Sequence, residues 1–293
     1  MTQDLALKLA LYKNLALKLT SYRFMKRYIS ERGKVFINSL NFEPYTISRN
    51  VIGEKFDFYI GNPTGKSWYG STFEDKEIEF VRKELINSGA IVIECGAHHG
   101  FLTILLSRWV GDDGKVIAVE PMSNNVAILR KNIELNGLRN VTVVAKAAGP
   151  TCGYVSMKRR SNGAVSPTSR GITNQVECVT GDVISQELNI VPSLLKIDVE
   201  GFEYKVLEGC KTILSNNPAI LLEIHPALVR YGNKFDDLWN FINPDVYDIF
   251  VQTGFEEPVP YSPGKFYGNQ MHLFFKPRPT AASLGGWRPD KSN

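Results

Sequence analysis

Short apolar runs alternate with amphipathic stretches from about residue 91 to the end of the chain. Apolar runs that predict strands lie at Ile91–Cys95, Val116–Glu120, Val141–Ala147, Leu194–Asp198, Ala219–Ile224, Val246–Val251 and Met271–Phe275. Apolar residues at helical spacing predict helices at about Phe101–Val110, Ser123–Asn136, Phe202–Ser215 and Phe235–Asn243. Strands that alternate with helices are typical of a mostly parallel sheet with helices on both faces. Seven strands in this pattern predict an α/β fold.

The last two strands are expected to differ from the others. The segment between them, from Glu256 to Gly268, is rich in proline and glycine and has no helical pattern. A parallel connection needs a crossover, usually a helix, whereas an antiparallel pair needs only a loop. We therefore expect an antiparallel hairpin that closes the sheet.

The residues before this alternation predict an N-terminal extension. From about Val35 to Gly70, short extended segments are interrupted by glycine and proline, which predicts a small β-rich lead-in. Apolar residues at helical spacing then predict a helix over Phe73–Asn87. The chain is thus divided into an N-terminal helix and β lead-in (residues 1–72), a core domain (73–277) and a solvated tail (278–293).

Two further segments stand out. The stretch from Met1 to Tyr28 repeats a short motif with basic residues five positions apart, and this spacing turns each charge by about 140° around a helix, so the charges form no single polar face. We expect a docking helix through which the chain could form a homo-oligomer, with a membrane-surface helix as the alternative. Between Gly153 and Asp182, two short strands are expected around the polar segment Arg159–Gly171, a loop long enough to be a substrate lid.

Composition narrows the class of protein. Of the 293 residues, 43% are hydrophobic and 22% charged, which is typical of a globular chain with a sizeable core. The net charge of +4 is too small for a dedicated nucleic-acid binder, and no nucleic-acid partner is expected. The four cysteines form no Cys-x-x-Cys pair, so reduced, buried thiols are expected. No uncharged apolar run reaches the roughly 18 residues of a membrane span, and we expect a cytoplasmic protein without a membrane partner.

A glycine turn follows the first strand of the core domain. Gly96 and Gly100 lie between this strand and a helix, where the backbone can approach a ligand and the helix offers free N–H groups. A dinucleotide site would need glycine where Glu94 and His99 stand, and Glu94 would repel a diphosphate. The same carboxylate can bind the ammonium group of a methionine moiety, and Glu120 can accept hydrogen bonds from both ribose hydroxyls. These residues favour S-adenosylmethionine as cofactor; the alternative is that the glycines only turn a strand into a helix.

Several motifs together resemble those of FkbM-type methyltransferases. They are Glu94-Cys-Gly-Ala-His-His-Gly100, Val119-Glu-Pro121, Asn132-Ile-Glu-Leu-Asn-Gly137, Leu195-Lys-Ile-Asp-Val-Glu-Gly-Phe-Glu203 and Leu222-Glu-Ile-His225. The resemblance covers about Glu77 to Pro226. It implies a class I, Rossmann-like fold, S-adenosylmethionine as methyl donor and, usually, O-methylation of a hydroxyl on a small molecule, sugar or polyketide. The cofactor residues it implies are Glu94, Gly96, Ala97, His98, Gly100, Glu120, Pro121 and Asp198.

The sequence departs from the family pattern at two places. The pair His98-His99 stands where the family often has asparagine with a small or β-branched neighbour, and at most one of these adjacent side chains can point at one site. Gly181 precedes Asp182 where leucine is common.

The segment Trp68–Thr72 could close over the carboxylate of the cofactor or could be a packed loop.

Polar residues end two neighbouring strands of the predicted sheet. Asp198 follows one strand, and Glu223 and His225 end the next, where alternation places them on one face. Methyl transfer to oxygen requires removal of a hydroxyl proton, so we expect His225 or Asp198 as base. The alternatives are a His225 bonded to the backbone and an Asp198 that caps a helix. Lys196 shares a face with Asp198 and is expected to pair with it or orient it, a plain salt bridge being the alternative.

The same cluster leaves alternatives for the reaction. Carboxylates from two strand ends could hold a divalent cation against an acceptor oxygen, as in metal-assisted O-methylation. We expect no metal, and a general base with Asp198 orienting His225 or the acceptor. N-methylation and a non-catalytic S-adenosylmethionine-binding module are further alternatives, although such a module would have no chemical need for the cofactor acids and the polar cluster.

Overall fold

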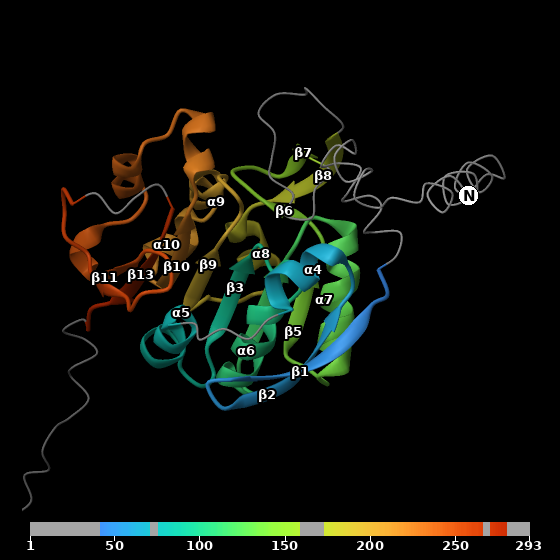
Figure 1. Ribbon diagram of the computed structural model, residues 1–293. Coiled ribbons are helices and arrows are strands. Elements are labelled where there is room, and N and C mark those ends of the chain that lie inside the picture. Colours follow the sequence, from blue (N-terminus) through green and yellow to red (C-terminus); the bar gives the residue numbers. More distant parts are fainter. Residues whose placement is uncertain (1–41, 71–75, 159–172, 266–269, 280–293) are drawn as a thin grey trace, which may run out of the picture.

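A central sheet of eight strands organises the part of the chain described by the computed structural model, which is residues 42–70, 76–158, 173–265 and 270–279 (Figure 1). The strands are β3 (Ile91–Cys95), β4 (Lys115–Val119), β5 (Val141–Val144), β9 (Leu194–Ile197), β10 (Ala219–Ile224), β11 (Tyr247–Gln252), β12 (Val259–Pro260) and β13 (Met271–Pro277). All seven predicted strands are confirmed, and the two-residue β12 is added to them. The fold is the predicted Rossmann-like α/β class.

The order of the strands brings the predicted polar strand ends together. Across the sheet the order is β12-β11-β13-β10-β9-β3-β4-β5. Strands β5, β4, β3, β9 and β10 pair in parallel, whereas β13 pairs antiparallel with both β10 and β11. The predicted closing hairpin is therefore confirmed. Because β9 and β10 are parallel neighbours, their carboxyl ends lie at the same edge of the sheet.

Alternation along the strands explains why both faces of the sheet are covered. In β3, Ile93 and Cys95 belong to the core on one face, and Val92 belongs to the core on the other. The first face packs against α8 (Gly181–Glu187), α9 (Glu203–Glu208) and α10 (Lys211–Ser215). The second face packs against α6 (Phe101–Val110), α7 (Ser123–Leu135) and the N-terminal elements.

The N-terminal extension packs into the second face. The hairpin of β1 (Tyr45–Val51) and β2 (Glu54–Ile60) confirms the extended part of the predicted lead-in. Phe58 is fully buried in the same core as α6, and the backbone N–H of Tyr59 donates to Asn132 of α7 at 2.7 Å. Figure 1 shows this blue hairpin beside α7. The division of the chain at residue 72 stays a prediction.

Two helices before β3 follow this hairpin. The first, α4 (Pro63–Tyr69), corrects the expectation of extended segments up to Gly70: Asn62 caps it by accepting from the N–H of Gly65 at 2.7 Å, and Pro63 occupies its first turn. The second, α5 (Lys76–Phe80), continues as a π-helical turn, η1 (Val81–Leu85), within the predicted helix 73–87.

Two predicted helices of the core domain are corrected. The helix expected over 202–215 divides into α9 and α10 at Gly209, where a Cβ atom would lie 2.1 Å from the carbonyl oxygen of Gly149. The helix expected over 235–243 is a 3-10 helix, η3 (Phe235–Asn240), and two further 3-10 turns flank it, η2 (Pro226–Tyr231) and η4 (Pro244–Val246). Pro244 cannot continue an α-helix through its missing N–H, which limits the length of any helix here.

A second, three-stranded sheet lies beyond β5. The predicted strand 141–147 breaks after Val144, and β6 (Ala147–Ala148) pairs with β8 (Thr173–Val179), which pairs with β7 (Gly153–Lys158). The two strands expected in this excursion are confirmed. Thr180 then caps α8, a helix that the sequence pattern missed, and Gly181 is required there because a Cβ atom would lie 2.4 Å from the Cys210 sulfur.

Some expectations concern residues outside the described ranges. These are the N-terminal helix within Met1–Tyr28, the loop Arg159–Gly171 and the tail beyond residue 279. Among the described helices, none combines the length and the apolar character that crossing a bilayer requires. Of the four cysteines, three are buried thiols as expected, whereas Cys152 is exposed.

Candidate active site

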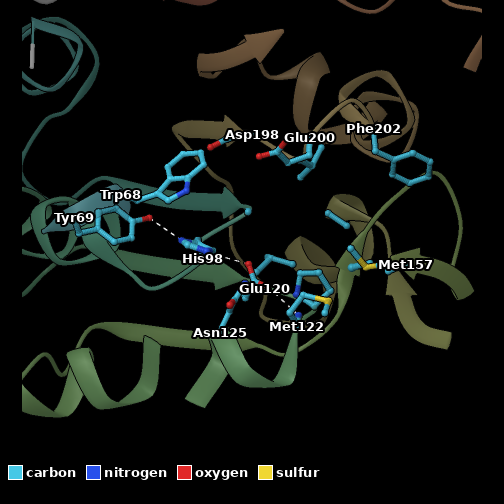
Figure 2. A pocket seen from close by; sticks show the side chains of 16 residues that line it. Trp68, Tyr69, His98, Glu120, Met122, Asn125, Met157, Asp198, Glu200 and Phe202 are labelled. Carbon is cyan, nitrogen blue, oxygen red and sulfur yellow. Dashed lines mark hydrogen bonds between the residues drawn. The ribbon is translucent and has the colours of Figure 1, made fainter. Parts of the chain in front are cut away.

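Two cavities open at the carboxyl ends of the central strands. The smaller one runs past β4 and the second sheet, and Figure 2 shows the side chains that line it. The larger one, of about 760 Å³, extends toward α5, β10 and β13. Both are lined by Trp68, Tyr69, Gly96, His98 and Asp198. The two cavities therefore meet where the sequence predicts the cofactor and the chemistry.

Glu120 lies in the wall of the small cavity and is 4% exposed. Its Oε1 accepts from the N–H of Met122 at 2.9 Å and from Asn125 at 3.1 Å, and its Oε2 accepts from the N–H of His98 at 3.0 Å. A carboxylate has about four acceptor positions, so these three donors leave one on Oε2. Burial raises the pKa of Glu120 to about 7, against the pull of these hydrogen bonds. Pro121, beside it, lines the same cavity.

The glycine turn after β3 is required by packing. A Cβ atom on Gly96 would lie 1.8 Å from the carbonyl oxygen of Asp198, and Gly96 has φ of +87°. Gly100, also at φ +87°, precedes α6, and a Cβ atom there would lie 2.5 Å from Leu129. Ala97 between them is buried and lines the large cavity. Any side chain at Gly96 would thus push β3 away from the end of β9.

His98 and His99 have different surroundings, as their adjacency predicts. His98 lines both cavities, has a positive φ of 50°, and its Nδ1 is 2.8 Å from the hydroxyl of Tyr69. His99 is fully buried and lies 3.4 Å from the side chain of Asn62. Burial lowers the pKa of His98 to about 3 and that of His99 to about 4, so both rings are neutral at pH 7.

The segment that ends at Gly70 contributes two aromatic rings to the site. Trp68 is 53% exposed and lines both cavities, whereas Tyr69 stacks on Phe101 with ring centroids 5.4 Å apart. Figure 2 shows Trp68 and Tyr69 together on one side of the small cavity. Both rings line the cavities, and Tyr69 is in addition packed on Phe101; that the segment closes over the carboxylate of the cofactor stays a prediction.

Three charged side chains project from one face of β3 and β9. Lys196 is 6% exposed, and its Nζ donates to the carbonyl of Gly96 at 2.9 Å and to Asp198 at 3.3 Å. Glu94 is 1% exposed, is paired in register with Lys196 and accepts from Thr103 at 2.5 Å. Burial opposes a charge on Lys196, but Asp198, Glu94 and Glu223 outweigh it and raise the pKa of the lysine. Lys196 is therefore a cation that holds Asp198 and the glycine turn.

His225 lies within a ring of carboxylates. Its Nδ1 is 2.8 Å from Glu203, and its Nε2 lies 3.3 Å from Glu223, 3.8 Å from Asp198 and 3.9 Å from Glu200. Burial opposes a charge on the imidazole, but hydrogen bonds to Glu203 and Glu223 outweigh it and raise the pKa of His225 to about 11. Partial burial raises the pKa of Asp198 to about 6, against the attraction of Lys196. The predicted cluster is thus brought together.

His225 and Asp198 differ in access to the cavities. Asp198 lines both, whereas His225 is 8% exposed and lines neither. Within the part of the chain that the structure describes, His225 bonds to the side chain of Glu203, and Asp198 does not cap α9, which begins at Glu203 with Phe202 at its N-cap. Both structural alternatives considered for these residues are therefore disfavoured.

Several lining residues were missed by the sequence pattern. In the small cavity these are Met122, Asn125, Ala147, Ala148, Met157, Val199 and Phe202, and in the large one Glu77, Gln270, Met271 and His272. Asn125 is a 2% exposed polar residue, but exposure cannot be read from sequence. His272 could have been found, because a closing hairpin on β10 places it opposite Glu223.

A protein-family model decides the identity of the chain. The model of the methyltransferase FkbM domain matches residues 94–249, which is more than half of the sequence. The chain belongs to the FkbM methyltransferase family. It is an S-adenosylmethionine-dependent methyltransferase, as the cofactor residues predict.

Curated proteins and solved structures add more distant similarities. A probable cobalt-precorrin-6B C(15)-methyltransferase (decarboxylating) of Sulfurisphaera tokodaii is 22% identical over 174 residues, 56% of this chain and 90% of that protein. An S-adenosylmethionine-dependent O-methyltransferase structure from Thermotoga maritima is 15% identical, with a TM-score of 0.44, and 80% of this chain and 78% of that chain are covered. An rRNA methylase structure from Streptococcus thermophilus is 10% identical, with a TM-score of 0.40, and the coverage is 68% and 93%. The acceptor of this FkbM methyltransferase therefore has to be argued from its own site.

Proposed function

We propose that this FkbM methyltransferase transfers the methyl group of S-adenosylmethionine to a hydroxyl oxygen of a small-molecule, sugar or polyketide-like acceptor. The observation that carries the proposal is the meeting of the two cavities at Asp198 and Gly96. A cofactor in the small cavity and an acceptor in the large one would come together beside Asp198. Open α/β sheets bind their ligands at the carboxyl ends of the strands, where both cavities lie.

The small cavity fits the adenosine part of the cofactor. Glu120 keeps an acceptor position on Oε2 for a ribose hydroxyl, and Pro121 lies next to it. Accepting from both hydroxyls would require one of the three protein donors to Glu120 to move. Apolar side chains around the cavity suit an adenine ring, namely Met122, Met157 and Phe202.

The methionine part of the cofactor is proposed to lie along the glycine turn. The backbone comes close there because the turn consists of Gly96, Ala97, His98, His99 and Gly100, and the buried Glu94 is among the residues that line the large cavity. Glu94 offers a negative charge for the ammonium group of the cofactor. A neutral His98 adds no repulsion toward the positive sulfonium.

The large cavity is proposed to bind the acceptor. Its polar wall contains Asp198, Glu223, Gln270 and His272, and its apolar wall contains Ile78 of α5 and Val81 of η1. Such a mixture suits a neutral molecule with an apolar face and hydroxyl groups. The cavity wall holds the cations Lys196 and His272 as well as four carboxylates, Glu77, Glu94, Asp198 and Glu223, so it lacks the positive surface that a phosphate backbone needs, and nucleic acid is not the proposed acceptor.

The acceptor hydroxyl loses its proton as the oxygen is methylated. Of the two proposed bases, Asp198 is the group that reaches the acceptor, and Lys196 holds its carboxylate in place. His225 contacts neither cavity, so its proposed role is to position Asp198 and Glu223. The chain thus provides a carboxylate, not an imidazole, at the reacting oxygen.

The test combines binding and turnover on the full chain. S-adenosylmethionine affinity is measured by calorimetry, and radiolabelled methyl uptake is screened over hydroxylated acceptors, with the product methyl ether identified by mass spectrometry and NMR. Asp198→Asn is expected to lower turnover by roughly 10²–10⁴ while S-adenosylmethionine still binds. Methyl uptake on nitrogen would replace the O-methylation proposal by N-methylation. Tight cofactor binding without transfer to any acceptor would favour a non-catalytic module.

A further inference from the structure

We infer that Asp198, Glu223 and His225 form a binding site for one divalent metal cation in the wall of the large cavity. Each of the three residues offers a ligand atom, and these atoms all lie within 4.8 Å of one another. A cation between them would be 2.0–2.3 Å from each atom, as metal–oxygen and metal–nitrogen distances require. The role of this cation in methyl transfer rests on the proposed function, whereas the geometry of the site does not.

The ring of His225 is presented as a metal ligand. Glu203 Oε1 accepts from His225 Nδ1 at 2.8 Å, so the other ring nitrogen, Nε2, faces Glu223 and Asp198. Metal-ligating histidines usually donate their second ring N–H to a carboxylate, which fixes the tautomer and makes the ligand more basic. Glu203 is positioned for this by a second hydrogen bond, from the N–H of Gly201 at 2.8 Å.

A second observation is the burial of Glu203 itself. Its side chain is 0% exposed, and its Oε2 has no hydrogen-bond partner among the described residues. A buried carboxylate oxygen without a partner costs free energy unless a positive charge lies nearby. The positively charged His225 ring supplies that charge when no metal is bound, and a divalent cation at Nε2 would replace the Nε2 proton and supply it instead.

The ligand set indicates the class of cation. Two carboxylates and one imidazole suit Mn²⁺, Mg²⁺ or a similar ion with mixed oxygen and nitrogen ligands. Three protein ligands leave coordination positions free, and Asp198 and Glu223 bring them to the large cavity. An acceptor with an oxygen at that position would be held beside the methyl donor. Asp198 Oδ1, the oxygen nearer His225, would bind the cation, and Oδ2 would stay available to accept the proton of the acceptor hydroxyl.

The test is Mn²⁺ binding by the full chain, followed through the electron paramagnetic resonance signal of the free ion. We expect one ion per chain, and a loss of affinity of at least about 10-fold in Glu223→Gln and in Glu203→Gln. Glu134→Gln, which removes an exposed carboxylate of α7, is the matched control and should bind like the wild type. No Mn²⁺ binding by the wild type, or equal binding by all variants, would overturn the inference.

A measurement on the wild type avoids the risk that a variant does not fold. Bound Mn²⁺ should broaden the NMR signals of the His225 ring and leave those of His99 sharper, since His99 lies in a different part of the site. Broadening of neither ring contradicts the proposed position. Methyl transfer is measured separately with and without EDTA. If EDTA does not affect the transfer and no Mn²⁺ binds, the metal site is wrong and the proposed function stands. If Mn²⁺ binds but no acceptor is methylated, the metal site stands and the proposed function is wrong.

Discussion

Gly96 shows how one residue can serve packing and ligand binding together. The carbonyl of Asp198 leaves no space for a Cβ atom, and the backbone at Gly96 is left-handed. Loss of cofactor binding in Gly96→Val would therefore not demonstrate a cofactor contact, because β3 and β9 would have to separate. The turn predicted from the sequence is confirmed, but the glycine in it is required first of all by packing against the end of the neighbouring strand β9.

Glu120 provides a residue-scale prediction with a pH dependence. In Glu120→Gln, S-adenosylmethionine affinity should fall by about 1.5–3 kcal/mol, the usual scale for hydrogen bonds to a charged group. In the wild type, affinity should also fall as the pH drops below about 7, because a buried carboxyl with a raised pKa becomes protonated there and accepts more weakly. Calorimetric titration between pH 8 and pH 6 checks both. A variant that keeps the pH dependence of the wild type would show that another group causes it.

Lys196 provides a second prediction, for stability. Lys196→Met removes the buried cation from beside Glu94 and Asp198, and breaking such an arrangement should cost about 3–5 kcal/mol in the free energy of unfolding. Lys131→Met, which removes an exposed i,i+3 pair with Glu134, should cost less than about 1 kcal/mol. Urea denaturation of both variants gives the comparison. Equal losses would mean that Lys196 contributes no more than a surface charge.

At the scale of elements, strands were more predictable than helices. Each central strand is an apolar run long enough to be seen in the sequence, and alternation along β3 places Val92 and Ile93 in opposite cores. The sequence pattern missed the break at Gly209, where the carbonyl of Gly149, 60 residues away in the chain, leaves no space for a side chain. In contrast, α4 carries its own signal, Asn62 followed by Pro63, and only the expectation of a β-rich segment concealed it.

The cap of α4 allows a prediction for an element. Asn62→Ala leaves the N–H of Gly65 without its acceptor and should reduce the free energy of unfolding by about 0.5–2 kcal/mol. Because α4 carries Trp68 into both cavities, cofactor affinity should fall as well. Thermal denaturation and calorimetry check the two effects. Asn50→Ala, at an exposed position of β1, serves as the control and should change neither.

At the scale of the whole molecule, the site was predictable where it follows from the sheet. Parallel strands that end at one edge brought Asp198 to Glu223, and alternation put Lys196 beside Asp198. Glu203 and Glu77 were not assigned roles, because their contacts with His225 and His272 depend on how α9 and α5 pack on the sheet. Such contacts depend on tertiary packing, which no local pattern encodes.

The same assembly makes cofactor binding a test of the whole fold. The small cavity is built from α4, β4, α7, the second sheet and the loop after β9, so a ligand there binds only the folded chain. At a concentration about 100 times the dissociation constant, S-adenosylmethionine should add about 2.7 kcal/mol to the free energy of unfolding. For a chain of this size that corresponds to a rise in Tm of about 4–5 °C.

Thermal denaturation with and without S-adenosylmethionine measures this rise, and Glu120→Gln is the matched variant. At the same ligand concentration its Tm should rise less, because a ligand that binds more weakly stabilises the folded state less. Lys131→Met, which changes an exposed side chain of α7, is the control and should show the same rise in Tm as the wild type. An equal rise in Glu120→Gln would place the cofactor away from Glu120, and the assignment of the small cavity to adenosine would then be wrong even though the family, and with it the methyl donor, would stand.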